Sequence, residues 1–299
     1  MYPKEYQDMQ VQVKAIASKI IRAALFIVLL LPLSGCGDSI FEAIAFAPAR
    51  QLDDDVSVCR YFNRVADRDC ENTEFEELFF QSLDPKVRLH ALFFPNPNTR
   101  KLIVYFHGNG AHIYWRLRHS LRLAELANVF IVSYRGYSKS TGEPSEAGVY
   151  EDAIATLEYV SEELGFATTQ TYIFGRSLGG AVAIGALDSL VSDNDYGGLI
   201  LVSPFYSGLR MAEDKGLGWV PGLNNPFDSA SKVRNFSMPL LVIHGTEDNI
   251  IPFEHGYDLY RQYPIDDKVF RTVHGVGHHG ISRIAGENYW RWIGNLVAR

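Results

Sequence analysis

Short apolar runs with few polar interruptions recur along the chain after residue 100. In chain order they read KLIVYFH, VFIVSY, TYIFG, GLILVS and LLVIHG, with KVFRTV as a weaker final run. Such runs are typical of strands that are buried on both faces of a parallel sheet. Residues 145–164 repeat apolar side chains every three or four positions, which predicts a helix capped by Ser145, and residues 281–299 predict one closing amphipathic helix. This alternation predicts an α/β fold, with a mostly parallel central sheet and helices on both faces.

Two Phe-rich runs, ELFFQSL and VRLHALFFP, precede this pattern and are separated by Asp84-Pro85. Short runs joined by such a turn signal predict an antiparallel hairpin at the start of the sheet. Residues 36–74 are polar and mixed without a sustained period, so they are interpreted as a tether and lead-in. The predicted organisation is therefore a signal segment over 1–35, the tether over 36–74 and one globular domain over 75–299.

The N-terminal segment has the three-part layout of an export signal: basic residues, an apolar stretch and then small residues. The apolar stretch covers residues 23–33, or eleven positions, whereas a membrane-spanning helix needs about 20. Its end, Leu33-Ser34-Gly35-Cys36, resembles the bacterial lipoprotein box, in which the cysteine becomes the lipidated first residue. An ordinary secretory signal with an incidental Cys36 is the alternative. Lipidation would give stable membrane attachment if more than one acyl chain is present.

Charge and cysteine content narrow the function further. The formal net charge of −7, with acidic and basic residues interleaved, argues against a nucleic-acid partner, because such binding depends on clustered Lys and Arg. Cys59 and Cys70 are the two cysteines that remain besides Cys36. In an exported, oxidising setting an even pair predicts a disulfide, with two free thiols as the alternative.

The stretch Gly175-Arg176-Ser177-Leu178-Gly179 contains the candidate nucleophile. It follows an apolar run and opens a segment of small residues, LGGAVAIGALDSL. This is the context of the Gly-x-Ser-x-Gly elbow, in which a tight strand-to-helix turn exposes the serine hydroxyl. A serine that only caps a helix would not need glycines on both sides.

A resting serine hydroxyl is a weak nucleophile and needs a base held by an acid. Asp248 follows the run LLVIHG, with Glu247 as a fallback, and His278 follows KVFRTV, with His279 as a fallback. In parallel sheets, residues just beyond the strands' carboxyl ends share one edge. The order Ser177, Asp248, His278 therefore predicts a catalytic triad.

Acyl transfer also needs donors for the developing oxyanion. The backbone N–H of Leu178 is one candidate, and the small, flexible loop His107-Gly108-Asn109-Gly110 supplies the other. Asn109 is the chosen second donor and Gly110 its alternative. A zinc site at the histidines of residues 274–279 is disfavoured, because the intervening glycines break helical spacing and no further ligand cluster is evident.

With these motifs in place, the chain resembles the α/β-hydrolase superfamily, and within it the short-lidded branch that contains eukaryotic protein depalmitoylases and many bacterial hydrolases. The matching segments are YFHGNG, SYRGYSKSTGEPSEAGVYEDA, IFGRSLGGAVA, LVSPFYS, VIHGTEDNIIP and GVGHH. The resemblance implies Ser177, Asp248 and His278 as the triad and a loop-shaping role for Tyr134 and Arg135. The chain departs from the family pattern at His279 and Gly280, where Asn and Asp are usual.

The resemblance implies a serine hydrolase of carboxylic esters or thioesters that needs no cofactor or metal and acts on a small or acylated substrate. Two alternatives stay open: a serine peptidase or amidase, and a catalytically silent binding lipoprotein with the same fold. The expected form is a monomer anchored through Cys36 to a bacterial envelope membrane. Gly37, in place of an aspartate after the cysteine, favours the outer membrane where two membranes exist.

Overall fold

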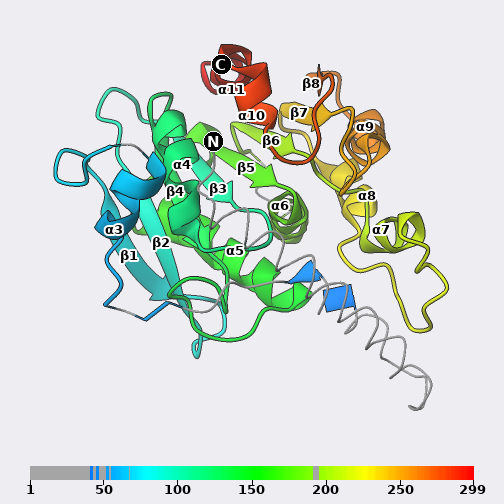
Figure 1. Ribbon diagram of the computed structural model, residues 1–299, viewed down its shortest axis with the longest axis horizontal. Helices are drawn as coiled ribbons and strands as arrows, with labels where there is room; N and C mark the ends of the chain where they lie inside the picture. The colour runs from blue at the N-terminus through cyan, green and yellow to red at the C-terminus, as the bar shows by residue number, and fades with distance from the viewer. Residues whose placement is uncertain (1–40, 43–44, 47–51, 54, 67, 191–194) are drawn as a thin grey trace.

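The central feature of the computed structural model is one eight-stranded sheet. The model describes residues 41–42, 45–46, 52–53, 55–66, 68–190 and 195–299. The strands are β1 (Glu76–Gln81), β2 (Arg88–Phe94), β3 (Leu102–Phe106), β4 (Asn128–Ser133), β5 (Thr171–Arg176), β6 (Gly198–Val202), β7 (Leu240–Gly245) and β8 (Lys268–Val273). They are ordered β1-β2-β4-β3-β5-β6-β7-β8, as Figure 1 shows.

The direction of the strands agrees with the predicted fold. β1 pairs antiparallel with β2, and β2 pairs antiparallel with β4, whereas the pairs from β4 through β8 are all parallel. The predicted opening hairpin and the mostly parallel sheet are both confirmed. Every residue of β3, β4, β6 and β7 is buried. β8 lies at the edge and is mostly half-buried, which explains why its run is the weakest in the sequence.

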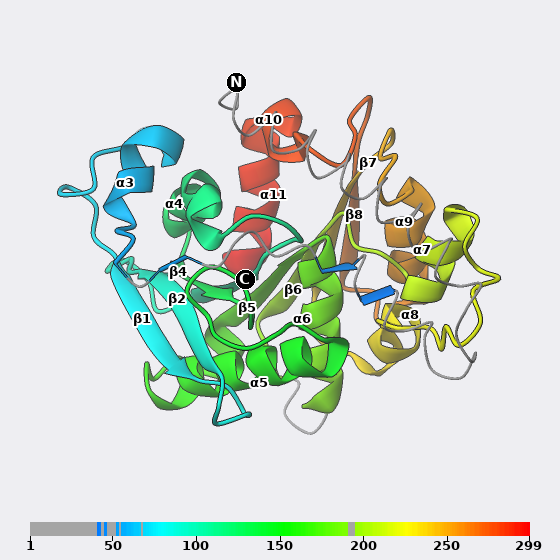
Figure 2. The same ribbon diagram turned by 60° about the horizontal axis from the view of Figure 1, so that its bottom comes forward.

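Helices cover both faces of the sheet. The α-helices are α3 (Cys59–Tyr61), α4 (Leu117–Ala124), α5 (Glu146–Glu162), α6 (Leu178–Ser189), α7 (Gly208–Asp214), α8 (Ser229–Lys232), α9 (Phe253–Gln262), α10 (Ile281–Ala285) and α11 (Glu287–Val297). Shorter π or 3-10 turns are η1 (Phe62–Ala66), η2 (Ile113–Arg116), η3 (Thr168–Gln170) and η5 (Val233–Asn235). α4 and α11 lie on one face, and α5 and α6 lie on the other (Figure 2). The two faces carry separate apolar clusters.

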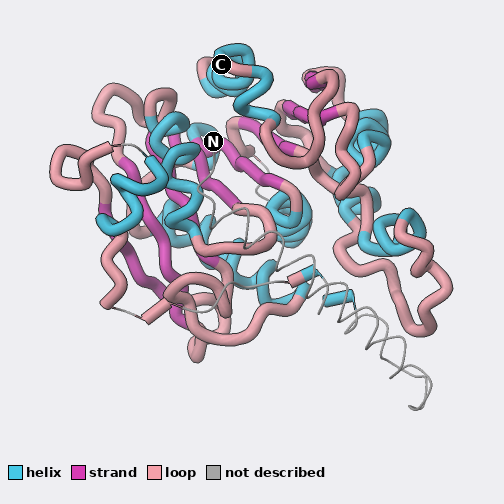
Figure 3. The backbone as a smooth tube through the Cα atoms, viewed as in Figure 1, coloured by secondary structure: helices cyan, strands magenta, loops and turns pink. Residues whose placement is uncertain are grey.

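The predicted helix at residues 145–164 is confirmed as α5. The hydroxyl oxygen of Ser145 accepts a hydrogen bond from the Gly148 N–H at 3.1 Å, so Ser145 is its N-cap. Between β6 and β7 the chain forms only α7, a long loop, α8 and η5, and Figure 3 shows this loop in pink. This insertion is too short to form a cap domain.

The prediction of one closing helix over residues 281–299 is wrong. Two helices, α10 and α11, meet at Gly286, whose φ of 57° and ψ of −136° no helix contains. Glycine adopts this conformation without the steric penalty that a Cβ brings, so the chain turns there. Trp290 and Trp292 of α11 pack partly buried against the apolar cluster on their face of the sheet.

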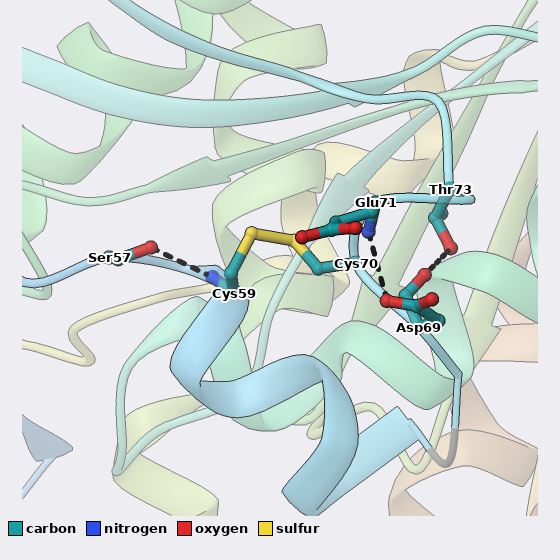
Figure 4. Close-up of a disulfide and its surroundings, with 6 residues drawn as sticks. All are labelled: Ser57, Cys59, Asp69, Cys70, Glu71 and Thr73. Atoms are coloured by element: carbon teal, nitrogen blue, oxygen red, sulfur yellow. Dashed lines mark hydrogen bonds between the residues drawn. A yellow bond between two sulfur atoms is a disulfide. The ribbon is translucent and has the colours of Figure 1, made fainter.

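Part of the predicted tether is packed against the domain. The side chain of Phe62 is fully buried, and Val58 and Cys70 belong to the same apolar cluster. Cys59 and Cys70 form a disulfide, which confirms the predicted pair (Figure 4). Packed structure therefore begins before residue 75, and the lead-in joins the apolar cluster on the α4 face of the sheet.

Residues still closer to the N-terminus also contact the domain. The rings of Phe41 and Phe46 lie 6.3 and 5.8 Å from that of Phe227, and a carboxylate oxygen of Glu42 accepts from the Glu146 N–H at the start of α5. The predicted lipidation site, Cys36, lies outside the described residues. Within the described ranges, no helix combines the length and apolar character needed to cross a bilayer.

Candidate active site

Ser177 occupies the turn between β5 and α6. Its φ of 54° and ψ of −123° place a non-glycine residue in a strained backbone conformation. The Ser177 N–H donates to the Val202 carbonyl at 2.9 Å, and the Ser177 carbonyl accepts from the Gly180 N–H at 2.9 Å. The strain is therefore held by hydrogen bonds on both sides, as expected for a nucleophile elbow.

The two flanking glycines are required by space. A Cβ at Gly175 would lie 2.6 Å from the Gly179 carbonyl oxygen, and a Cβ at Gly179 would overlap the carbonyl oxygen of Phe106 at the end of β3. In both cases the added Cβ would lie far closer than a normal van der Waals contact allows. The sequence motif is thus explained by close backbone approach, which also brings α6 against the loop that follows β3.

Three predicted residues meet at the carboxyl edge of the sheet. The Ser177 hydroxyl lies 3.1 Å from Nε2 of His278, and Nδ1 of His278 lies 2.8 Å from Oδ2 of Asp248. Asp248 follows β7, and His278 lies in the loop between β8 and α10. Residues 71 and 30 positions apart in sequence thus form one continuous hydrogen-bonded chain. This is the geometry of a serine hydrolase triad.

Local contacts fix the protonation pattern of the triad. Burial alone would raise the pKa of the Asp248 carboxyl, but hydrogen bonds from His244 and His278 outweigh it and hold this pKa well below its usual range. Burial also lowers the pKa of His278 below its ordinary value of 6.5, although the Asp248 carboxylate opposes this shift. Near neutral pH the imidazole is therefore neutral, with Nδ1–H donating to Asp248 and Nε2 able to accept from Ser177.

The loop after β3 lies directly beside the nucleophile. A Cβ at Gly108 would sit 3.2 Å from the Cβ of Ser177. Gly110 and Ala111 have φ of 76° and 61°, so the loop turns sharply there. The Gly110 N–H donates to Oδ1 of Asn109 at 2.8 Å, so the two candidate oxyanion residues are joined by a local hydrogen bond.

The loop after β4 supports the predicted oxyanion loop. The Tyr134 hydroxyl donates to the His107 carbonyl at 2.8 Å, and the Tyr137 hydroxyl donates to Oδ1 of Asn109 at 2.9 Å. Arg135 forms a buried ion pair with Asp152 of α5 at 2.8 Å. Tyr134 and Arg135 thus shape this region, as the sequence resemblance implies.

The fallback residues do not replace the chosen ones. Glu247 is exposed and its N–H donates to the Val276 carbonyl, whereas Asp248 is buried and contacts His278. His279 is more exposed than His278 although still partly shielded, and the two rings are nearly perpendicular at a centroid distance of 5.2 Å. No cluster of three or more His, Cys, Asp or Glu side chains among the described residues is arranged to hold a metal ion.

Sequence reasoning missed a contact between the nucleophile's neighbour and the histidine loop. Arg176 donates from Nη2 to the carbonyl oxygen of His278 at 3.2 Å. The partners are 102 positions apart, and a guanidinium bound to a backbone carbonyl leaves no motif at the acceptor. The position of Arg176 inside the Gly-x-Ser-x-Gly turn is the one signal that points to it.

The sheet order, the elbow and the triad geometry define the fold class of an α/β hydrolase, and sequence comparisons agree. A family profile described as "Serine aminopeptidase, S33" matches residues 97–223. The α/β hydrolase domain-containing protein WAV2 of Arabidopsis thaliana is 34% identical over 241 residues, which cover 74% of this chain and 77% of that protein. The chain therefore belongs to the α/β-hydrolase family.

Other relatives are matched over a smaller share of their length. The α/β hydrolase domain-containing proteins aho-3 of Caenorhabditis elegans and 17C of Homo sapiens are 32% and 30% identical, over 62% and 70% of this chain. This chain spans only 55% and 62% of those proteins. These matches support the family, and their own activities are not transferred to this chain.

Solved structures show the same fold. An α/β hydrolase from Vibrio vulnificus has a TM-score of 0.69 at 19% identity, covering 88% of this chain and 94% of its own. An esterase from Pyrococcus furiosus has a TM-score of 0.66 at 16% identity, covering 85% and 98%. At these identities the likeness establishes the fold alone.

Proposed function

We propose that this protein is a serine hydrolase that cleaves carboxylic esters or thioesters through an acyl-enzyme at Ser177. The observation that carries the proposal is the continuous hydrogen-bonded chain from Ser177 through His278 to Asp248, with distances of 3.1 and 2.8 Å. A serine that served only packing would need neither a strained turn nor a buried imidazole and carboxylate aligned on it.

The reaction begins when Oγ of Ser177 attacks the substrate carbonyl while Nε2 of His278 takes the hydroxyl proton. The imidazolium that forms is stabilised by the Asp248 carboxylate, which stays ionised. The N–H groups of Leu178 and Asn109 would bind the oxyanion of the tetrahedral intermediate. When the intermediate collapses, the C–O or C–S bond to the leaving group breaks and His278 protonates that group.

Hydrolysis of the acyl-enzyme repeats the sequence with water as the nucleophile. Nε2 of His278 takes a proton from water as the water oxygen bonds to the acyl carbon. The second tetrahedral intermediate then expels Oγ of Ser177, which recovers its proton from His278. The products are the free acid and the original alcohol or thiol, and no external reductant or cofactor enters the balance.

A peptidase or amidase is the second candidate, and the description of the matching family profile as a serine aminopeptidase favours it. The same triad can cleave an amide if His278 protonates the poorer amine leaving group. A matched ester, thioester and anilide with one acyl group would therefore decide between the candidates by their relative kcat/KM.

We also propose that the protein acts outside the cytoplasm, attached to a bacterial envelope membrane through Cys36. The Cys59–Cys70 disulfide supports export, because structural disulfides persist mainly in oxidising compartments. Metabolic labelling with a palmitate analogue tests this attachment: label is expected on the wild-type chain and not on Cys36→Ser. Equal labelling of both would refute it.

The hydrolase proposal is tested with p-nitrophenyl esters from acetate to palmitate and with matched thioesters. Ser177→Ala is expected to abolish turnover of the substrates that wild type accepts. Ser203→Ala is a matched control, because Ser203 also follows a parallel strand with positive φ, 47°, but is fully buried. Turnover that survives in folded Ser177→Ala would refute the acyl-enzyme at this residue.

A further inference from the structure

Two arginines are attached to the loops that enclose Ser177. Arg176 precedes the nucleophile and donates from Nη2 to the His278 carbonyl at 3.2 Å, with the same nitrogen 3.5 Å from Nδ1 of His279. Arg116 ends η2 and donates from Nη2 to the Gly110 carbonyl at 3.0 Å. One guanidinium is therefore bound to the histidine loop and the other to the predicted oxyanion loop.

The positive charges of both guanidinium groups lower the pKa values of the same two histidines, His279 and His119. Burial, Arg176, His278 and Arg116, in that order of influence, lower the pKa of His279 to about 4. Arg176 and Arg116 likewise join burial in lowering the pKa of His119 to about 3. The geometry agrees, because Arg176 adjoins Ser177 in sequence and Arg116 binds the loop in which a Cβ at Gly108 would lie 3.2 Å from that of Ser177.

Neither charge is balanced by a carboxylate within ion-pair distance in the described part of the chain. Both arginines are partly buried. Arg135 and Arg210, which are also shielded from solvent, each contact an aspartate at 2.8 and 2.7 Å. Arg116 and Arg176 thus bring two partly buried positive charges, bound to backbone carbonyls in the described structure, to the loops beside Ser177.

Each arginine has donors beyond the single nitrogen that binds a loop carbonyl, because a guanidinium carries five N–H groups. Partial burial weakens the solvation of both charges, and two like charges near one another disfavour this arrangement further. A bound anion would relieve both effects, and the planar fork of arginine suits carboxylate and phosphate oxygens.

We propose that Arg116 and Arg176 form an anion subsite that selects esters or thioesters bearing a carboxylate or phosphate group near the scissile bond. This inference rests on the proposed hydrolase function and narrows its substrate class. The anionic group belongs either to the acyl portion or to the leaving group, and the two sources are separated by the choice of probes. Each arginine is expected to contribute about tenfold to the selectivity in kcat/KM, the lower range for a hydrogen bond to a charged group.

Two pairs of probes test the subsite in the full chain. For the acyl side, p-nitrophenyl hydrogen adipate is compared with its neutral methyl ester, p-nitrophenyl methyl adipate. For the leaving-group side, 4-butyryloxybenzoate is compared with the neutral 4-butyryloxybenzamide. The measured quantity is the ratio of kcat/KM for the anionic and neutral members of each pair at low ionic strength.

Variants separate charge from loop support. Arg176→Gln and Arg116→Gln remove the charge and keep an N–H donor for the loop carbonyl, whereas Arg176→Lys and Arg116→Lys keep the charge. Arg118→Gln is the matched control, because exposed Arg118 also donates to a backbone carbonyl, that of Val65, at 3.0 Å.

The subsite predicts an anionic preference in one pair for wild type, the lysine variants and Arg118→Gln, and a loss of about tenfold in that preference for each glutamine variant. Added salt should also reduce the preference. A ratio near one in both wild-type pairs, or a ratio that the glutamine variants leave unchanged, would overturn the subsite. Equal loss in Gln and Lys variants would also overturn it, by assigning the arginines to loop support.

The neutral probes keep the two proposals distinguishable. Ser177-dependent turnover of neutral esters without an anionic preference leaves the hydrolase proposal standing and removes the subsite. Absence of Ser177-dependent turnover for all four probes and for the p-nitrophenyl ester series removes both.

Discussion

Replacing Asp248 by Asn tests how the triad fixes its tautomer. Oδ1 of Asp248 accepts from the N–H groups of Ile250 and Ile251 at 3.0 and 2.9 Å, while Oδ2 accepts from Nδ1 of His278 at 2.8 Å. In Asp248→Asn the amide oxygen is needed at the two backbone donors. The amide NH₂ group must then face His278.

The size of the expected loss of activity follows from these contacts. Turning the NH₂ group toward the two backbone N–H groups would leave both without an acceptor, at about 1–3 kcal/mol each, or about 2–6 kcal/mol together. In the preferred orientation Nδ1 of His278 has to accept, so its proton moves to Nε2, which can no longer take the Ser177 proton. At 1.36 kcal/mol per tenfold, the productive tautomer becomes about 30-fold to 25,000-fold rarer. Loss of the carboxylate that stabilises the imidazolium adds to this effect.

We therefore expect kcat/KM of Asp248→Asn to fall by about 10³-fold to 10⁴-fold, with little change in melting temperature. The assay is initial-rate ester hydrolysis with the best p-nitrophenyl ester, beside a thermal melt of each protein. Glu247→Gln is the matched control, because this exposed neighbour has no contact with His278 and should keep wild-type activity. A folded Asp248→Asn protein with more than a tenth of wild-type kcat/KM would refute the tautomer argument.

Three further predictions concern stability and pH. Arg135→Leu leaves the fully buried Asp152 carboxylate without its ion-pair partner and should lower the unfolding free energy by about 3–5 kcal/mol. Adding Asp152→Leu should recover part of that loss. Urea titrations that show no recovery in the double variant would contradict this expectation. The Cys59–Cys70 disulfide closes a separation of 11 residues, so Cys59→Ser with Cys70→Ser should lose about 3 kcal/mol, and an unchanged melting temperature would exclude that contribution. Catalysis needs neutral His278, and burial lowers the pKa of His278 below 6.5. The value of kcat/KM should therefore be highest above that pKa and should fall as the pH drops through it. A midpoint above pH 6.5 would contradict His278 as the base.

Most of the fold could be predicted from local sequence patterns. The runs that became β3, β4, β6 and β7 are apolar at almost every position because both of their faces are buried, and this leaves a direct trace in the sequence. The spatial order, with β3 between β4 and β5, leaves no such trace. It depends on which strands pair across long connections.

The two fold features that sequence reasoning missed have physical explanations. Gly286 breaks the last helix through one backbone conformation, while apolar spacing continues on both sides of it. In residues 58–70 the buried side chains of Val58, Phe62, Ala66 and Cys70 recur at intervals of four, and together with the disulfide they hold the segment on the domain. Two members of this short repeat, Ala66 and Cys70, have small side chains and lie among polar residues, so the repeat does not stand out in the sequence.

The candidate site also has features that the sequence predicts and features that it does not. Ser177, Asp248 and His278 were predictable because each directly follows a strand or lies in the loop after one, and a parallel sheet brings such positions to one edge. The contact of Arg176 with the His278 carbonyl and that of Arg116 with the Gly110 carbonyl were not. Their acceptors are backbone oxygens, which every residue carries, so they depend on the folded geometry alone.

The central claim is that Ser177 is a nucleophile activated by His278. The most direct measurement is peptide-resolved mass spectrometry of the full chain after brief exposure to a fluorophosphonate, beside Ser177→Ala and His278→Ala. One adduct is expected on the peptide that contains Ser177, absent in Ser177→Ala and formed much more slowly in His278→Ala. Folded wild-type protein that forms no adduct, or forms it on another residue, would contradict the account.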